Sequence, residues 1–458
     1  MSIQTYMELF LKASKTLEKY RNSFPEYKPF KKIQLNKKQE KILLKLSKRL
    51  FNTYPTFHPN YIGQMIKPPI DLAALSYSIA LIYNSNNHAL DGGPETSFLE
   101  KEAIEQLAEM VGYKNFLGHL TSGGTMANLE GLWVSKLATQ NKKFAICENA
   151  HYTHSRLSQV IDFRYKLIPM DEKGKMDLDY LRGLLKKEKI GTIVATLGTT
   201  GFGALDEIHE LVNLKKEFNF RLHIDAAYGG YFKVLANSNS NLVDKKIFNS
   251  VRKSDSIVID PHKHGLQPYG CGSIIFSDPS IGKFYKHDSP YTYFTSKELH
   301  LGEITLECSR PGAAAAAFWA TLQAFPLKGK NGMFEILKLT RMAALKFYDL
   351  LSGSEFFLPI LKPELDIINY FPKAKSTEEI SKLSETLFNI WMSNKDYPIF
   401  VSKYRIKTDF FKRLFPDIKQ NSKEVVVLRS VLMKPEHYFY IKDIFNEIEK
   451  SCKKLFNK

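Results

Sequence analysis

Long apolar runs are missing from this sequence of 458 residues. The longest unbroken run covers residues 313–320, whereas a membrane-spanning helix needs roughly 18 or more apolar residues. The first twenty residues carry Glu8, Lys12 and Lys15, so they lack the basic-then-apolar order of a secretory signal. We therefore expect no membrane partner.

Cysteine is scarce, and its spacing is irregular. The four copies are Cys147, Cys271, Cys308 and Cys452, with no Cys-x-x-Cys pair and no His/Cys cluster at zinc spacing. A disulfide framework and a cysteine-bound metal are therefore unexpected, and so is any metal site. The sparse cysteines favour a reducing, cytoplasmic location.

Acidic residues are outnumbered by basic ones. The sequence has 65 Lys and Arg against 48 Asp and Glu, a formal charge of +17. Such a surplus can indicate a nucleic-acid or anionic membrane partner. However, the lysines are spread along the whole chain, mostly beside acids, and form no single basic arm. We therefore interpret them as solvated surface and expect no nucleic-acid partner.

Short apolar runs alternate with helical patterns between about residues 115 and 280. The runs lie at 144–147, 190–197, 221–224, 256–259 and 273–276. A helical pattern at 206–218 separates two of them. This alternation predicts an α/β domain with a mainly parallel sheet covered by helices on both faces. Ligands of such sheets bind at the carboxyl ends of the strands.

The flanking regions have different patterns. The first twenty residues predict an amphipathic helix whose apolar face needs a partner surface, and residues 70–83 predict a buried helix. Ser97 to Glu100 resembles a capping box that opens a further helix, ending at Gly112.

Breaker residues at 326–332 follow a helical pattern that begins at Ala313. Beyond them a long helix to about residue 351, a strand at 425–432 and a terminal helix predict a small α+β domain. We therefore expect three parts. Residues 1–85 form an N-terminal helical segment that packs on a partner subunit, residues 86–328 form a large α/β domain, and residues 329–458 form a small C-terminal domain.

A glycine-rich turn precedes one of the predicted helices. Residues 121–128 read Thr-Ser-Gly-Gly-Thr-Met-Ala-Asn. Glycines let backbone N–H groups approach an anion at a helix N-terminus, where the helix dipole also favours negative charge. An ordinary tight turn would look the same. The candidates for anion binding are Ser122, Gly123, Gly124 and Thr125.

Two charged residues lie just past apolar strands. Asp225 ends the run at 221–224, and Lys263 follows the run at 256–259 with a histidine on either side, His262 and His264. Buried lysines are rare without a partner or a function, so Lys263 is a candidate Schiff-base nucleophile. The alternatives are an aspartate that caps a turn and a lysine on a surface loop.

Two more segments follow predicted strands. Residues 148–156 hold two histidines, His151 and His154, which compete for any role. Residues 195–203 are rich in threonine and glycine and include Thr200.

The order and spacing of these segments resemble the group II pyridoxal-phosphate-dependent amino-acid decarboxylases, most closely the microbial tyrosine decarboxylase branch. The resemblance covers about residues 55–330, from His58-Pro-Asn-Tyr through Ser309-Arg-Pro-Gly312. The latter segment is also similar to sphingosine-phosphate lyases. The resemblance to the decarboxylases implies a fold-type I, transferase-like α/β fold with a mainly parallel seven-stranded sheet and a small C-terminal α+β domain. It also implies pyridoxal 5'-phosphate as cofactor.

The resemblance also implies residue roles at the cofactor. Lys263 would bind the pyridoxal carbon, Asp225 would pair with the pyridine nitrogen, and His151 would stack on the ring, with His154 as the alternate. Further cofactor contacts are implied for the phosphate-binding residues Ser122, Gly123, Gly124, Thr125 and His262, and for the ring neighbours Thr200 and Ala227.

On the substrate side the resemblance is looser. It implies a pocket lined by His58, Tyr61 and His88, and a proton donor on a loop that carries Tyr291 and Tyr293. A homodimer with shared active sites is also implied, in which Ser309 and Arg310 would reach the partner's phosphate. Arg429 matches a position that some relatives use for the substrate carboxylate.

These features predict decarboxylation of an L-amino acid to its amine and CO2, with an aromatic, tyrosine-like substrate favoured. An acidic amino acid and a carbon–carbon lyase of the same fold stay open as alternatives. A basic binding protein that has lost the chemistry is disfavoured, because Lys263, Asp225 and His151 are all intact.

Overall fold

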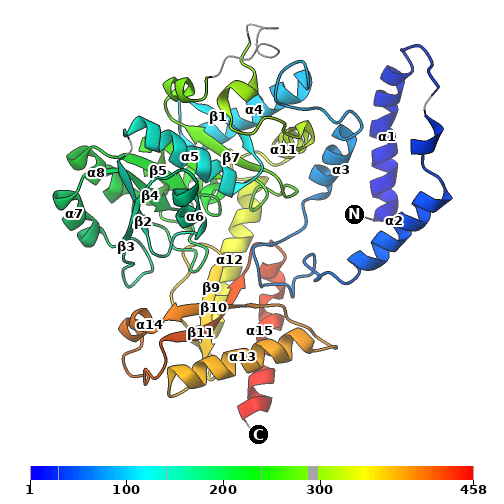
Figure 1. Ribbon diagram of the computed structural model, residues 1–458. Coiled ribbons are helices and arrows are strands. Elements are labelled where there is room, and N and C mark those ends of the chain that lie inside the picture. The colour runs from blue at the N-terminus through cyan, green and yellow to red at the C-terminus, as the bar shows by residue number, and fades with distance from the viewer. Residues whose placement is uncertain (1, 29, 141, 239, 287–297, 457–458) are drawn as a thin grey trace.

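The computed structural model describes residues 2–28, 30–140, 142–238, 240–286 and 298–456. Figure 1 shows a large α/β body, a smaller sheet with helices below it, and two N-terminal helices that project to one side. Across the described ranges, no helix is both long and apolar enough to cross a membrane.

The large body is built on a seven-stranded sheet with the order β1-β7-β6-β5-β4-β2-β3. β7 runs antiparallel to both of its neighbours, and the remaining pairs are parallel. The predicted mainly parallel sheet is therefore confirmed. Its strands are β1 (Leu117–Thr121), β2 (Lys143–Cys147), β3 (Tyr165–Ile168), β4 (Ile190–Thr196), β5 (Arg221–Asp225), β6 (Ser256–Ile259) and β7 (Gly272–Phe276).

Alternate side chains of the strands enter two different cores, because successive residues of a strand point to opposite faces. Val258 and Ile274 pack under α5, whereas Ile257 and Ile275 pack in the larger core on the other face. The first face is covered by α5 (Gly124–Ala138) and α6 (Thr153–Val160). The other face carries α4 (Pro94–Val111), α7 (Leu178–Lys187), α8 (Ile208–Phe218), α9 (Lys233–Asn237) and α10 (Lys245–Ser250).

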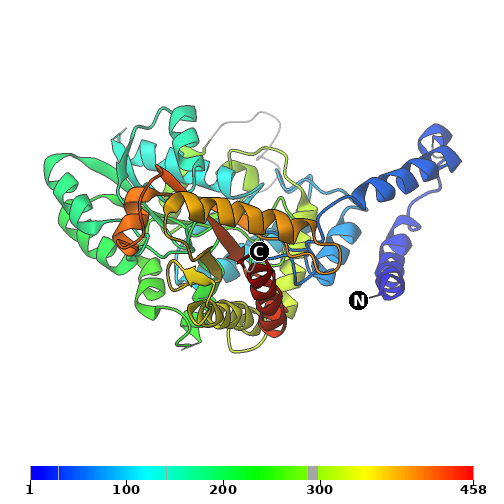
Figure 2. The same cartoon turned by 90° about the horizontal axis from the view of Figure 1, so that it is seen from below.

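The smaller domain has a four-stranded antiparallel sheet with the order β10-β11-β9-β8. It follows α11 (Gly312–Ala324), and the view in Figure 2 shows its helices α13 and α15 from below. Its strands are β8 (Phe357–Pro359), β9 (Ile367–Pro372), β10 (Ser402–Lys407) and β11 (Glu424–Val431). Its helices are α12 (Met333–Ser352), α13 (Thr377–Ser393), α14 (Thr408–Leu414) and α15 (His437–Phe456).

The N-terminal helices α1 (Ile3–Arg21) and α2 (Lys37–Leu50) form an arm with no buried side chain. α1 touches the body through α3 (Asp71–Ala80) and the turn after it, where the Tyr83 hydroxyl donates to the Leu17 carbonyl at 3.4 Å. The predicted amphipathic helix is confirmed, and the described residues cover its apolar face only in part.

The start of α4 differs from the capping box predicted at Ser97. The helix begins at Pro94, because proline is well suited to a first helical position, and Gly93 is its N-cap. Ser97 therefore lies inside the helix and Glu100 is buried, so the prediction of the helix start was wrong. The predicted end is confirmed, since Gly112 adopts φ +90°.

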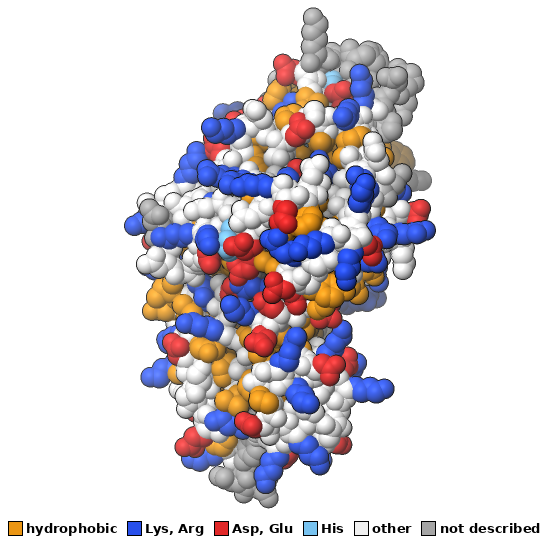
Figure 3. All heavy atoms as spheres, turned by 90° about the vertical axis from the view of Figure 1, so that its left-hand side faces the viewer, with side chains coloured by type: hydrophobic (Ala, Val, Ile, Leu, Met, Phe, Trp, Pro, Cys, Tyr) orange, Lys and Arg blue, Asp and Glu red, His pale blue; other side chains and the backbone are white. Residues whose placement is uncertain are grey.

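Basic side chains are dispersed over the surface. On the face in Figure 3, Lys and Arg side chains alternate with acidic and apolar ones instead of forming one patch. Several are paired, such as Lys143 and Lys166, which both contact the Glu188 carboxylate. This distribution supports the interpretation of the positive charge as solvated surface.

Candidate active site

The five predicted segments meet at one cavity of about 320 Å³ at the carboxyl ends of the strands. The residues proposed as cofactor contacts all line it, namely Ser122, Gly123, Gly124, Thr125, His151, Thr200, Asp225, Ala227, His262 and Lys263. A larger cavity of about 730 Å³ lies against α12, but apolar side chains make up most of its lining. The cavity of about 320 Å³, which polar and charged side chains line, is therefore the candidate active site.

An anion cradle forms one end of this cavity. β1 ends at Thr121, and α5 begins at Gly124, so the first N–H groups of the helix face the cavity. Gly123 has φ +154°, and a Cβ at Gly124 would lie 2.6 Å from Oδ2 of Asp260. Glycine is thus required here, and the exposed N–H groups can bind a phosphate.

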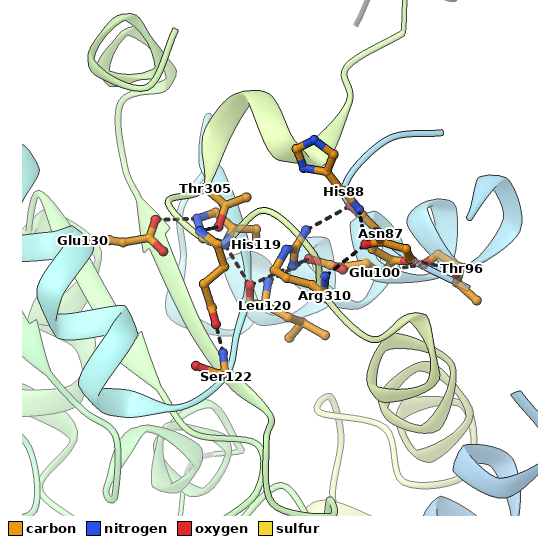
Figure 4. A network of polar contacts seen from close by, with 12 residues as sticks. Asn87, His88, Thr96, Glu100, His119, Leu120, Ser122, Glu130, Thr305 and Arg310 are labelled. Carbon is orange, nitrogen blue, oxygen red and sulfur yellow. Dashed lines mark hydrogen bonds and ion pairs between the residues drawn. The ribbon is translucent and has the colours of Figure 1, made fainter. Parts of the chain in front are cut away.

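A network of polar groups, buried around Glu100 and exposed at Ser122, holds this turn, as Figure 4 shows. Glu307 Oε2 accepts a hydrogen bond from the Ser122 N–H at 2.9 Å. Glu100 Oε1 accepts from the Leu120 N–H at 2.9 Å and from Arg310 NH1 at 2.5 Å. The turn is therefore fixed by contacts within one chain.

The side chain of Arg310 does not lie where we expected it, at the phosphate of a partner subunit. Its side chain is 5% exposed and forms a buried ion pair with Glu100 of the same chain. The Ser309 hydroxyl accepts a hydrogen bond from Asn86 Nδ2 at 3.2 Å. Both residues thus contact their own chain, and Arg310 has a structural role beside the glycine-rich turn at 121–125.

Lys263 reaches the cavity beside a buried carboxylate. Its Nζ lies 3.0 Å from Oδ2 of Asp260, whose side chain is 2% exposed. The sequence reasoning missed Asp260, although it ends the β6 run just as Asp225 ends β5. His262 donates from Nδ1 to the Cys271 carbonyl at 2.7 Å, and burial lowers the pKa of His262, so the neutral imidazole is favoured.

Asp225 forms the opposite end of the site. Its Oδ2 lies 2.9 Å from His154 Nε2, and its Oδ1 accepts from the Ala227 N–H at 3.2 Å. Burial alone would raise the pKa of Asp225, but the His154 hydrogen bond and the charges of His154 and Lys263 outweigh burial and lower it. The carboxylate is therefore ionised at neutral pH.

The two competing histidines take different places. His154 is fully buried behind Asp225 and is not in the cavity lining. His151 lines the cavity, and burial lowers its pKa, so the ring is neutral at neutral pH. This arrangement favours His151 over His154 as the residue that faces a bound ring.

The expected substrate residues do not line the cavity of the single chain. His58 is exposed, and Tyr61 packs on Phe400 with ring centroids 6.0 Å apart. His88 is half-buried beside Asn86, whose Oδ1 accepts from the His88 N–H. Tyr291 and Tyr293 lie outside the described residues. Their roles stay predictions.

Arg429 also lies outside the lining. It is buried in β11, where NH1 donates to the Ser402 hydroxyl at 3.3 Å. Its Nε and NH2 have no hydrogen-bond partner among the described residues. Within the same ranges, no group of three or more His, Cys, Asp or Glu side chains could hold a metal ion.

Comparison of the sequence with known proteins identifies several relatives. The family model described as the pyridoxal-dependent decarboxylase conserved domain matches residues 26–371. An L-tyrosine decarboxylase of Levilactobacillus brevis is 24% identical, over 75% of this chain and 72% of its own length. An L-tyrosine/L-aspartate decarboxylase of Methanocaldococcus jannaschii is 28% identical, over 68% of this chain and 78% of its own.

Solved structures share the fold at low sequence identity. The Oryza sativa TDC, solved with PLP and tryptamine, has a TM-score of 0.77 and 15% identity, with 98% of each chain covered. The mouse CSAD structure has a TM-score of 0.77 and 15% identity, with 96% of this chain and 91% of that chain covered. The fold is therefore fold-type I, as the family resemblance implied.

The family match spans most of the sequence, and the cavity brings an anion cradle, a buried carboxylate and a lysine together. The chain belongs to the pyridoxal-dependent decarboxylase family and is a pyridoxal-phosphate-dependent amino-acid decarboxylase.

Proposed function

We propose that this decarboxylase converts an aromatic, tyrosine-like L-amino acid to its amine and CO2. L-tyrosine decarboxylases of Levilactobacillus brevis and Enterococcus faecium are among its relatives. The observation that favours an aromatic over an acidic substrate is the charge of the cavity. Lys263 is the one Lys or Arg side chain among its described lining residues, so these residues offer no further cation to a second carboxylate.

The cavity fits pyridoxal phosphate. The N-terminal turn of α5 offers N–H groups to the phosphate, Asp225 offers an ionised carboxylate to the pyridine nitrogen, and Lys263 offers an amine to the pyridoxal carbon. When bound, the cofactor accepts the electron pair that remains on the substrate Cα after CO2 leaves.

The side chains around the cavity would orient the cofactor and supply protons to the cofactor and the substrate. Asp225, held ionised by His154, keeps a proton on the pyridine nitrogen. Asp260 holds the Lys263 ammonium in the cavity. His151, with its lowered pKa, offers a neutral face to the ring, and Thr200 and Ala227 lie beside it. Tyr291 and Tyr293 are our candidates for returning a proton to Cα.

Tyr269 connects the loop after Lys263 with the N-terminal segment of the chain. The Tyr269 ring lies 4.8 Å from that of His262, and the Tyr269 hydroxyl donates to the Met65 carbonyl at 3.0 Å. The segment that carries His58 and Tyr61 is thus joined to the loop after Lys263. We propose that this segment, together with His88, contributes to the substrate pocket.

A homodimer with shared sites accounts for the N-terminal arm. The α2 side chains Ile42, Leu43, Leu46 and Leu50 are all at least half exposed in the single chain. An apolar surface of this kind marks a protein–protein contact. We propose that a second copy covers it and that the enzyme acts in the cytoplasm.

Replacing Lys263 tests the central assignment. Lys263→Ala should remove the covalent link to the cofactor and lower turnover by several orders of magnitude, because the lysine both binds the cofactor and releases the product. Absorbance of the purified enzyme in the visible range, before and after borohydride, reports the link. An alanine variant that keeps the band and near-normal turnover would show that Lys263 is not the cofactor lysine.

Replacing Asp225 tests the electrostatic role of this site. Asp225→Asn should lower kcat by about 10²–10³-fold and weaken cofactor binding, since it keeps the shape and removes the charge that holds the pyridine proton. The matched control is Asp206→Asn, another buried acid, which accepts from the Thr196 and Met176 N–H groups. It should lower stability without changing the cofactor spectrum. Equal rates for Asp225→Asn and the wild type would contradict the proposed role.

A substrate panel tests the proposed reaction. The kcat/KM for L-tyrosine or another aromatic L-amino acid should exceed that for L-aspartate and L-glutamate by about 10²-fold or more, because an unpaired carboxylate is costly to bury. CO2 and amine should form in equal amounts. Faster turnover of aspartate would refute the substrate class, and cleavage products without CO2 would identify a carbon–carbon lyase.

Sedimentation velocity tests the dimer. The wild type should sediment as a dimer at micromolar concentration, and Leu46→Asp should weaken association about 10-fold or more by burying a charge at the interface. Lys48→Glu is the control, since helical periodicity places Lys48 on the opposite face of α2. A monomeric wild type would contradict the proposal.

A further inference from the structure

Asp366 is a buried carboxylate that the roles assigned above do not use. It lies directly before β9 in the small domain, and its side chain has no solvent exposure. Its Oδ1 accepts a hydrogen bond from the Tyr228 hydroxyl at 2.6 Å. Tyr228 lines the cofactor cavity three residues after Asp225. A small-domain acid is thus bonded to the loop that follows β5.

The same carboxylate faces the loop that carries Lys263. His264, the next residue, is 1% exposed, and its Nε2 lies 3.3 Å from Asp366 Oδ2. Neither of these two atoms has a hydrogen-bond partner among the described residues. The His264 ring also packs edge-on against Tyr228, with centroids 4.7 Å apart. Asp366, Tyr228 and His264 therefore form one buried cluster between the two active-site loops.

Charged groups around the cluster favour the ionised form of Asp366, which accepts hydrogen bonds. Burial raises the pKa of Asp366 to about 6, against the opposing effects of the Tyr228 hydrogen bond and the charges of Lys67 and Arg341. Burial and the charges of Lys67 and Lys263 hold the pKa of His264 well below its ordinary value. At neutral pH an ionised carboxylate therefore faces a neutral imidazole at a distance of 3.3 Å.

Lys67 and Arg341 are fixed by their own contacts. Lys67 Nζ donates to the Met433 carbonyl at 3.3 Å, and Arg341 NH1 donates to the Leu365 carbonyl at 2.9 Å. The second contact holds the backbone of the residue before Asp366. A fully buried acid is rarely retained without compensating partners, and here the partners belong to both domains.

We propose that Asp366 is a positioning residue that, through Tyr228 and His264, fixes the loops carrying Asp225 and Lys263 relative to each other. The two groups must contact opposite ends of one rigid cofactor, so the distance between their loops sets how well both are engaged. This inference rests on the cofactor roles proposed for Asp225 and Lys263. It assigns the small domain a direct part in cofactor orientation.

The test uses the purified holoenzyme and the circular dichroism of the bound cofactor, which reports its orientation. Tyr228→Phe removes only the hydroxyl and should change the visible dichroism and speed cofactor release about 10-fold, as expected for one buried hydrogen bond. Asp366→Ala should do the same, and Asp366→Asn should be milder because its amide oxygen still accepts from Tyr228. The double variant Tyr228→Phe with Asp366→Ala should be little worse than either single one.

Two matched variants separate positioning from general stability. Tyr370→Phe removes a buried hydroxyl that contacts the Ser430 hydroxyl at 3.3 Å, and Glu364→Gln neutralises an acid that pairs with Lys175 at 2.7 Å. Both lie in the small domain and neither lines the cavity. They should lower Tm and leave the cofactor dichroism and release rate unchanged.

The outcomes are distinct. If Tyr228→Phe and Asp366→Asn lower Tm as the controls do while dichroism and release match the wild type, Asp366 has only a structural role and the inference is wrong. If the wild type itself shows no lysine-bound cofactor, the proposed function fails, and this is visible before any variant is compared. Asp366→Asn is nearly isosteric and lies outside the cavity lining, so it decides the question together with Tyr228→Phe even if Asp366→Ala does not fold.

Discussion

The arrangement of the active site depends on keeping one carboxylate charged in a buried place. Asp225 is 5% exposed, and burial of an unpaired charge of this kind is prohibitively costly. The His154 contact at 2.9 Å makes the ionised form favourable. Since His154 comes from α6, this helix has to lie across the carboxyl end of β5. The same placement of α6 leaves His151, three residues earlier, facing the cavity.

The remaining parts of the site follow from where the strands end. β1, β5 and β6 each end in a polar group at the same edge of the sheet, namely the glycine-rich turn, Asp225 and Asp260. Asp260 serves two neighbours at once, since it contacts the Lys263 ammonium and fills the space that a Cβ at Gly124 would need. The lysine and the anion cradle are therefore coupled through one carboxylate.

The sequence predicted those features that local pattern determines. Asp225 and Lys263 were singled out because each lies within four residues of the end of an apolar run, and the turn at Ser122 because glycines precede a helix; the structure places all three at one cavity. The separate places of His151 and His154 were not predictable, since both follow the same strand and only the path of α6 distinguishes them. The start of α4 was misjudged because Pro94 and Gly93 outweigh the Ser97 signal. The contact of Tyr228 with Asp366 joins residues 138 positions apart, so no local pattern contains it.

The charge of the cavity bears on the reaction itself. A substrate carboxylate is lost as neutral CO2, so an ion pair that stabilises it in the ground state would slow its departure. Among the described lining residues there is no arginine, and the lysine is already paired with Asp260. The two histidines that line the cavity are His151 and His262. Burial lowers the pKa of both, so both are neutral at neutral pH. A substrate carboxylate in such surroundings is not stabilised in its charged form. The ionised Asp225, in contrast, favours a protonated pyridine ring, which can accept the electron pair that CO2 leaves behind. The electrostatics of the site thus favour loss of CO2 over its retention.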